Sequence, residues 1–480
     1  MEFSNSFQRE TSGYAVDTGE RDELSLLISA PTNGVITSSA QLAARPYQVL
    51  KYPEAAYRRW GDSLFGDSIT WHQEYTANIM GLRYGQGSSA STGVLGTNAI
   101  FAPGDPYTAN TQIGEIYEQA GYTETGTVRL YTRQELSSTF GETGWKFTPF
   151  ASATAIGYMA GDMQAYSPAA DGFRAIVAGG FRSSADLVSD NDRLSVPALD
   201  LHRMRHVLTP YLNTWAGWNT AQNLAYAVYD QEVEAATGGA AVQAGVKQRF
   251  QTMRGGPGNW QSVDWLAVDA GLVWNESSDD LARTYQDGAQ YRQSPFPQYF
   301  SWRPELSQWG RNAYANFMLA ASNTLTLRGN LTYLIESDLP SGGSGAFGID
   351  NAARGTIGAS MQHAPDVSTF IEYRAINNFA PEDQYLSDAL LAGGVSYQIG
   401  KTYSLTFVPT YDLKENDFRA FNLNITREMP DFRLLGSFGY DAVQNQYFGG
   451  INIQIMGASA PGPLFGTNGG LFTPESGISR

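Results

Sequence analysis

Histidine is the side chain most often used for acid–base chemistry near neutral pH, and the chain has four: His72, His202, His206 and His363. His202 and His206 are four residues apart, a spacing that brings side chains together on a helix. The residues around them predict a strand instead, and no carboxylate follows at metal-ligand spacing. We therefore predict no metal, no cofactor and no catalytic residue, and the histidines are interpreted as polar surface or lumen groups. A Ser–His acyl-transfer site of a barrel-borne lipid hydrolase stays open as a less favoured alternative, because such sites are defined by geometry.

A second group of side chains shares one property: each is a cation on the polar face of a predicted strand. A charge that faces lipid costs about 2–4 kcal/mol at the middle of a bilayer, so these side chains must point inward. That requirement alone explains their positions. The functional interpretation is a polar lumen that tolerates anionic, phosphate-bearing cargo or solutes. The six lumen-facing candidates are Lys146, Lys247, Arg249, Arg328, Arg374 and Arg433.

The elements that must position these cations are strands with two different faces. In residues 325–335, Leu325, Leu327 and Leu331 alternate with Thr326, Arg328 and Asn330, and residues 402–412 and 421–426 alternate in the same way. Strands of about 10 residues with this pattern are typical of a membrane barrel. A soluble propeller or sandwich also alternates, but no repeat of about 40–50 residues is visible. The predicted fold is all-β: a large antiparallel transmembrane outer-membrane β-barrel of about 20 strands, with an error of several.

Upstream, the pattern predicts strands at 23–30 and 35–44 around Asn33 and Gly34, then at 69–84, 128–136, 144–159, 173–183, 206–218, 243–253, 263–274 and 299–310. Residues 45–67 are expected to be irregular, 85–126 a long loop and 186–192 a charged connection. From 312 onward, short and longer connections alternate. This alternation is expected of a barrel with short periplasmic turns and longer extracellular loops.

The predicted domains are a polar lead-in (1–22), the barrel (23–456) and a Gly/Pro-rich tail (457–480), which is expected to be disordered or a plug. The formal charge of −16 argues against nucleic acid as a partner. No apolar run reaches the length of about 20 residues that a membrane helix needs. The first 20 residues lack the apolar core of a signal peptide, so an exported barrel would be a mature form, a cut domain or a truncated product.

Three segments carry a family resemblance: residues 205–213 (RHVLTPYLN), 244–254 (AGVKQRFQTMR) and 263–269 (VDWLAVD). With residues 45–54 and 128–136 upstream, they resemble the barrel of the LPS-assembly outer-membrane protein family (LptD, also called OstA) across most of residues 20–456. The chain departs from that family in having neither cysteine nor room before residue 22 for a periplasmic jelly-roll.

The resemblance implies a translocon that receives lipopolysaccharide from periplasmic bridge proteins and inserts it into the outer leaflet. Cargo would pass through a polar lumen and a lateral seam between the first and last strands. A plug lipoprotein (LptE-like) inside the barrel and outer-membrane lipid around it would be the other partners. Prolines weaken strand pairing, so Pro31, Pro46 and Pro53 are the lateral-gate candidates.

We therefore predict a non-enzymatic lipopolysaccharide translocon in the outer membrane of a Gram-negative type of cell. The first alternative is a passive porin-like channel for small solutes, and the second is the barrel-borne lipid hydrolase.

Overall fold

The fold was analysed in a computed structural model of the full chain. The structure describes residues 10–31, 36–37, 44–45, 47–84, 112, 115, 118, 123–142, 144–159, 172–220, 229–230, 233–234, 238–256, 258–277, 311–335, 346–349, 352–378, 386–413, 416–441 and 446–455. Among these residues, no helix combines the length and the hydrophobicity that crossing a bilayer requires.

One antiparallel sheet of 20 strands dominates the described part of the chain. Its first half contains β1 (Glu10–Thr18), β2 (Asp22–Pro31), β5 (Tyr47–Leu64), β6 (Ile69–Tyr84), β7 (Gly126–Ser137), β8 (Trp145–Tyr158), β9 (Phe173–Ala185), β10 (Leu187–Val196), β11 (Leu201–Asn219) and β12 (Gly239–Arg254). Its second half contains β13 (Gln261–Ser277), β14 (Asn312–Ala320), β15 (Leu325–Leu334), β16 (Ala352–Ala364), β17 (Val367–Asn378), β18 (Leu386–Ile399), β19 (Tyr403–Asp412), β20 (Asp417–Glu428), β21 (Phe432–Asp441) and β22 (Gln446–Ile455). A separate two-stranded hairpin joins β3 (Ile36–Thr37) and β4 (Ala44–Arg45).

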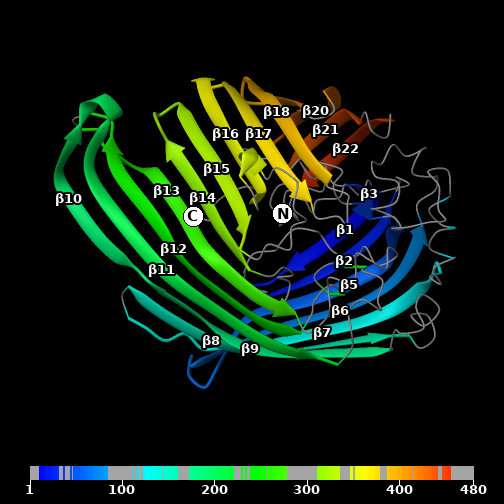
Figure 1. The fold of residues 1–480 in the computed structure, drawn as a ribbon. Coiled ribbons are helices and arrows are strands. Elements are labelled where there is room, and N and C mark those ends of the chain that lie inside the picture. Colours follow the sequence, from blue (N-terminus) through cyan, green and yellow to red (C-terminus); the bar gives the residue numbers. More distant parts are fainter. Residues whose placement is uncertain are drawn as a thin grey trace.

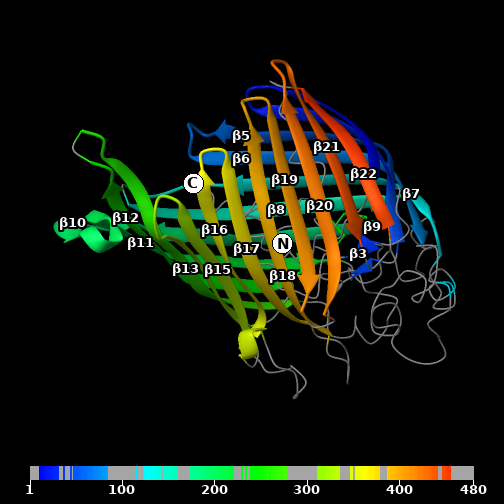
Figure 2. The ribbon, with the colours of Figure 1, turned by 90° about the horizontal axis from the view of Figure 1, so that it is seen from above.

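The sheet curls around a central space, with β14–β22 forming one wall and β1–β9 the other, as the two perpendicular views show (Figures 1 and 2). Each strand pairs with its neighbour in the chain, except that β9 and β10 both pair with β11 and lie end to end along its edge. β1 and β22 run in the same direction, and among the described residues no ladder joins them.

The two faces of the sheet carry opposite chemistry. On β7, Arg129, Tyr131 and Arg133 are buried on the inward face, while Leu130, on the opposite face, is 61 % exposed. The same inversion recurs around the sheet, so that large apolar side chains such as Ile371 and Ile451 are exposed on the outside. A water-soluble protein would bury these groups, whereas lipid solvates them. The protein is therefore an all-β transmembrane barrel of the outer-membrane type.

The connections differ systematically between the two ends of the barrel. At one end the strands are joined by short turns, among them residues 365–366, 400–402 and 429–431, with Gly400 in the left-handed conformation (φ 62°). At the other end lie the longer connections, among them residues 85–125, 220–238 and 335–351. Barrels of this class place short turns in the periplasm and long loops outside the cell, which orients the molecule. The β10–β11 hairpin projects at the short-turn end together with β12, because His202 of β11 still pairs with Met253 of β12 (Figure 2).

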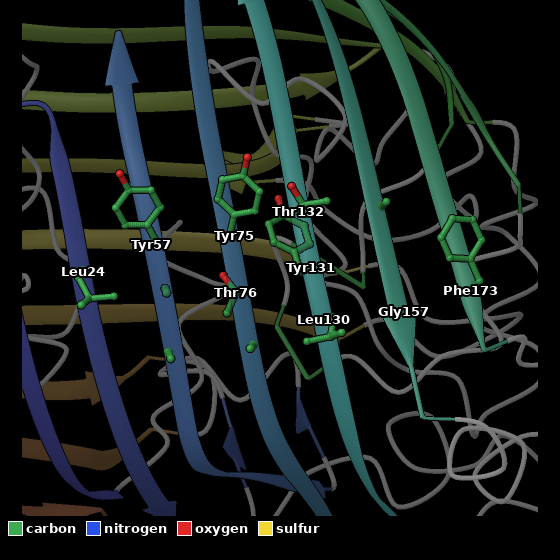
Figure 3. Close-up of a pocket in the computed structure, with 13 residues that line it drawn as sticks. Leu24, Tyr57, Tyr75, Thr76, Leu130, Tyr131, Thr132, Gly157 and Phe173 are labelled. Atoms are coloured by element: carbon green, nitrogen blue, oxygen red, sulfur yellow. The ribbon is translucent and has the colours of Figure 1, made fainter. Parts of the chain in front are cut away.

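A shallow groove of about 530 Å³ lies on the outward face of β2 and β5–β9 (Figure 3). Leu24, Leu130 and Phe173 line it, and its floor is made of small residues such as Ala155 and Gly157. At the short-turn side of the groove, Tyr57 and Tyr75 stack with ring centroids 6.3 Å apart. Amphipathic aromatic rings at this height are typical of the girdle of a membrane barrel.

The structure confirms the predicted fold class, and the strands expected at 69–84, 128–136 and 144–159 appear as β6, β7 and β8. The alternation of short and longer connections after residue 312 is also confirmed. The expected strand at 299–310 and the tail at 457–480 lie outside the described residues, as does nearly all of the 85–126 loop.

Three expectations were wrong. Residues 45–67 are not irregular, because 18 of them form β5. The register of β5 against β6 shifts near Pro53 and Gly61, and these shifts interrupt the alternation that would have predicted a strand. The charged stretch 186–192 belongs largely to β10, which is solvated on both faces and therefore lacks apolar alternation. The stretch expected as a lead-in contains β1, whose outward residues Thr11, Gly13 and Ala15 are too small or too polar to mark a face. Of residues 35–44, the structure describes 36–37, which form β3, and 44, which belongs to β4.

Candidate functional site in the barrel lumen

The densest group of buried charges lies inside the barrel, towards the end with the long connections. The structure describes residues 220, 229–230, 233–234 and 238 of the connection between β11 and β12. Four of these lie against the inward face of the sheet and are here called the inserted segment: Tyr229, Asp230, Val233 and Glu234. Backbone N–H groups of Val233 and Glu234 donate to the carbonyl of Asp230 (3.1 and 3.0 Å), so the segment makes a helix-like turn.

Three cations from separate strands meet this segment: Lys51 on β5, Arg129 on β7 and Arg174 on β9, here called the basic wall. Alternation puts all three on the inward face, because charged groups are excluded from the lipid side. β5, β7 and β9 are connected through β6 and β8, so the basic wall extends across five strands.

Asp230 is held between two of these cations. Lys51 donates from Nζ to Oδ1 of Asp230 (2.6 Å), and Arg129 donates from Nη2 to its Oδ2. Lys51 also donates to Glu54 (2.7 Å), its neighbour on the wall. Burial alone would raise the pKa of Asp230, but Lys51 and Arg129 outweigh burial and hold this pKa well below its usual range.

Glu234 is fully buried and has three donors around it. Arg129 donates from Nη1 to Oε1 of Glu234 (2.6 Å), and the hydroxyl of Tyr158 donates to the same oxygen (3.0 Å). The backbone N–H of Asp230 donates to Oε2 (2.7 Å). Arg174 donates to the Glu234 carbonyl (2.9 Å) and from Nε to Asn219 at the end of β11 (3.2 Å).

The charges of the described residues in this site are closely paired. Lys51 pairs with Glu54 and Asp230, and Arg129 pairs with Asp230 and Glu234, so two of the three carboxylates belong to the inserted segment. A buried ion pair is stable only when such charges are closely paired and hydrogen-bonded, because each ion loses its hydration. The arrangement therefore fixes the inserted segment against the wall of the lumen.

A second charged cluster lies on the same wall, closer to the short-turn end. Arg58 bridges Glu23 (3.0 Å) and Glu74 (3.2 Å) between β2, β5 and β6. Glu135 accepts from Arg133 (3.0 Å) and Arg182 (3.4 Å). The inward face of β2–β9 is thus charged along much of its height.

The six predicted lumen cations all lie on the inward register of their strands, but they do not come together, because they are distributed over β8, β12, β15, β17 and β21. Lys146 is exposed near the short-turn end, and Lys247 lies over the ring of Tyr211 at 5.6 Å.

The other four cations are placed as follows. Arg249 is 3.8 Å from Asp264 and half exposed, and Arg328 is partly buried. Arg374 is buried against Glu372, while Arg433 pairs with Glu428 at 2.6 Å on the rim. Their role in passage of a solute stays a prediction.

Two of the three predicted gate prolines are described. Pro31 ends β2 opposite Glu10, and Pro53 lies inside β5, so neither is in β1 or β22, the strands at the edges of the sheet. Pro46 lies outside the described residues.

The histidines gather no metal ligands: the described residues contain no group of three or more His, Asp or Glu that could hold an ion. His202 is 3.4 Å from Ser195 Oγ and 3.5 Å from Asp200, on the exposed turn between β10 and β11. A working nucleophile–base pair is about 2.6–3.2 Å apart in a site shielded from water, so this contact does not favour the hydrolase alternative.

The basic wall was not predicted from the sequence. Arg129 and Arg174 fall in predicted strands on the polar parity, so the signal that selected the six cations could also have found them. Lys51 was hidden because β5 was not recognised as a strand. The partners Asp230 and Glu234 carry no local signal, because they are far from the wall in the chain.

Comparisons with known proteins return no family, and the solved structures that they return have low similarity to the chain. No family model and no curated protein matches the chain. The solved structures that it resembles include the FrpB iron transporter from Neisseria meningitidis (11 % identity, TM-score 0.38, 90 % of this chain and 66 % of that one). The siderophore receptor PirA from Acinetobacter baumannii gives 10 % identity and a TM-score of 0.40, with 91 % and 66 % covered. A mutant of the Rh. blastica porin gives 11 % and 0.29, with 69 % and 91 % covered.

The chain thus spans less than two thirds of the length of the two iron-uptake proteins. These similar structures are iron and siderophore receptors and porins, and no family model matches, so the identification with the LPS-assembly family was wrong. The lipopolysaccharide translocation and the lateral gate that followed from it are not carried into the proposed function.

Proposed function

We propose that the protein is an outer-membrane channel for small polar solutes, narrowed near its external end by the inserted segment. The observation that carries this proposal is the pairing of the partly buried Asp230 and the fully buried Glu234 with Lys51 and Arg129 on the inward face of the sheet. A connection that is fixed by charges to the inner wall of a barrel reduces the bore at that height.

The composition of the inward face supports a path for water and polar solutes. Asn330, Thr356 and Asn424 on the far wall are polar, and the wall of β2–β9 carries the two charged clusters. Polar and charged linings lower the cost of moving a hydrated solute through a membrane and set which charge passes. This proposal takes up the porin-like alternative derived from the sequence.

The test is conductance in planar bilayers and sugar uptake into liposomes, using the purified full chain. Wild-type protein is expected to conduct, and Asp230→Asn/Glu234→Gln is expected to conduct more, because the inserted segment loses its three ion pairs with the wall. Arg205→Gln serves as a matched control, since Arg205 lies on the β10–β11 hairpin and its pair with Asp190 is exposed. A folded barrel that admits neither ions nor sugars, in wild-type and variant forms alike, would refute the channel.

A further inference from the structure

We propose that the basic wall is a binding site for small dicarboxylates, filled in this structure by the protein's own Asp230 and Glu234. The inference deepens the proposed channel function, because it names the class of solute that the lumen would hold. It rests on the contacts of Lys51, Arg129 and Tyr158 with the two carboxylates.

The charge of the wall changes when the inserted segment leaves it. Asp230 and Glu234 are the carboxylates of the inserted segment that pair with Lys51 and Arg129, and Glu54 pairs with Lys51 from the wall itself. When the segment leaves the wall, the wall therefore loses two negative charges. Arg129, which is 1 % exposed, would lose the acceptors of both Nη atoms. Such a site attracts an anion that replaces the two lost carboxylates.

The geometry of Arg129 indicates a ligand with two acid groups. Its Nη2 faces Asp230 and its Nη1 faces Glu234, so one guanidinium holds two separate carboxylates side by side. Lys51 completes the first carboxylate position, and the hydroxyl of Tyr158 completes the second. A short dicarboxylate can place one group in each position, whereas a monocarboxylate can satisfy only one. A neutral diamide brings no charge to either.

The contacts of the inserted segment are those of a competitor that a dicarboxylate could displace from the basic wall. Of the four described residues of the segment, Asp230 and Glu234 form ion pairs with the wall, and Tyr229 and Val233 are buried apolar contacts. An anion that binds the wall and not the segment shifts the equilibrium towards the displaced state by its differential affinity. Solute binding and opening of the bore would therefore be coupled.

The binding test uses succinate as the probe, with acetate and succinamide as the matched monocarboxylate and neutral controls, measured by calorimetry on purified protein in detergent. Asp230→Asn/Glu234→Gln should bind succinate about 10- to 100-fold more tightly than wild type, because competition by charged hydrogen-bonding groups is removed. Adding Arg129→Gln to that variant should abolish the gain, and adding Arg205→Gln, whose ion pair is exposed on the β10–β11 hairpin, should leave it unchanged. Succinate binding no tighter than in wild type, or a gain that survives Arg129→Gln, would overturn the site.

A measurement on the unmodified chain guards against a variant that fails to fold. Succinate should speed amide hydrogen exchange in the peptide containing Tyr229 and Glu234, while succinamide at the same concentration should not. Equal exchange with both compounds would also overturn the proposal. Conductance in potassium chloride tests the channel separately. A barrel that conducts but does not bind succinate refutes only the dicarboxylate site. A barrel that binds succinate but does not conduct refutes only the channel.

Discussion

Removing the guanidinium of Arg129 tests the central claim that charges fix the inserted segment inside the lumen. Arg129 is 1 % exposed and Glu234 is fully buried, and their Nη1 and Oε1 atoms are 2.6 Å apart. In Arg129→Gln, the Glu234 carboxylate stays buried with only the Tyr158 hydroxyl and the backbone N–H of Asp230 as donors. Loss of one partner of a buried pair costs about 3–5 kcal/mol.

We expect the lower end of that range, because Lys51 still holds Asp230 in the variant. A loss of about 3 kcal/mol raises the displaced population about 100-fold, since each factor of ten corresponds to about 1.4 kcal/mol. The assay is hydrogen exchange of the peptide containing Tyr229 and Glu234, with peptides of β12 as an internal reference. Arg249→Gln is the matched control, with an expected effect below about 1 kcal/mol because its ion pair is half exposed.

Two results would refute this reasoning. Protection of the segment that is equal in wild type and Arg129→Gln would show that the ion pairs do not hold it. Loss of protection throughout the β-strands would show that Arg129 stabilises the barrel wall rather than the segment. Glu234→Gln combined with Arg129→Gln completes a double-mutant cycle, in which the coupling should be a large part of the single-variant loss.

Other perturbations test the lipid-facing surface, the far wall and the pH response. Leu130→Arg places a charge on the outward face of β7 and should lower the free energy of unfolding in guanidinium by about 2–4 kcal/mol. Ser137→Arg places the same charge on the inward rim of β7 and should change the free energy of unfolding by no more than about 0.5 kcal/mol. Equal losses would contradict the assigned faces. Arg374→Gln removes a cationic partner of the buried Glu372 and should cost about 3 kcal/mol. Arg433→Gln, whose pair is 41 % exposed, should cost less than about 1 kcal/mol, and the reverse order would place Arg374 in solvent. Lowering the pH from about 7 to about 5 should not change the contribution of Asp230 to the conductance, because its lowered pKa keeps the Asp230 carboxylate ionised over this range. The stabilisation from Asp230 is present above the unperturbed pKa of about 3.9 and is lost only as the pH falls through the lowered pKa. A rise in wild-type conductance between pH 7 and pH 5 (about these values) that Asp230→Asn removes would contradict the lowered pKa of Asp230.

Sequence periodicity worked wherever a strand contacts lipid on one side and the lumen on the other. β6, β7 and β8 were predicted because Ile79, Leu130 and Ala153 alternate with polar residues on the inward face. It failed for β5 and β10. Pro53 and Gly61 break the pattern in β5 where its register shifts, and β10 lies against water on both faces.

Alternation by itself determined the class of fold, the inward direction of Lys247 and Arg374, and the two ends of the barrel. These follow from local rules. A strand exposes every second side chain to lipid, and the number of residues between two strands can be counted in the sequence. Only the tertiary structure decided which charges meet. Lys51 and Asp230 are 179 residues apart, and Arg129 and Glu234 are 105 apart. Their pairing depends on the curl of a 20-stranded sheet that brings β5 and β7 beneath the connection after β11. No local pattern encodes that approach, because it arises from the accumulated register of every strand between them.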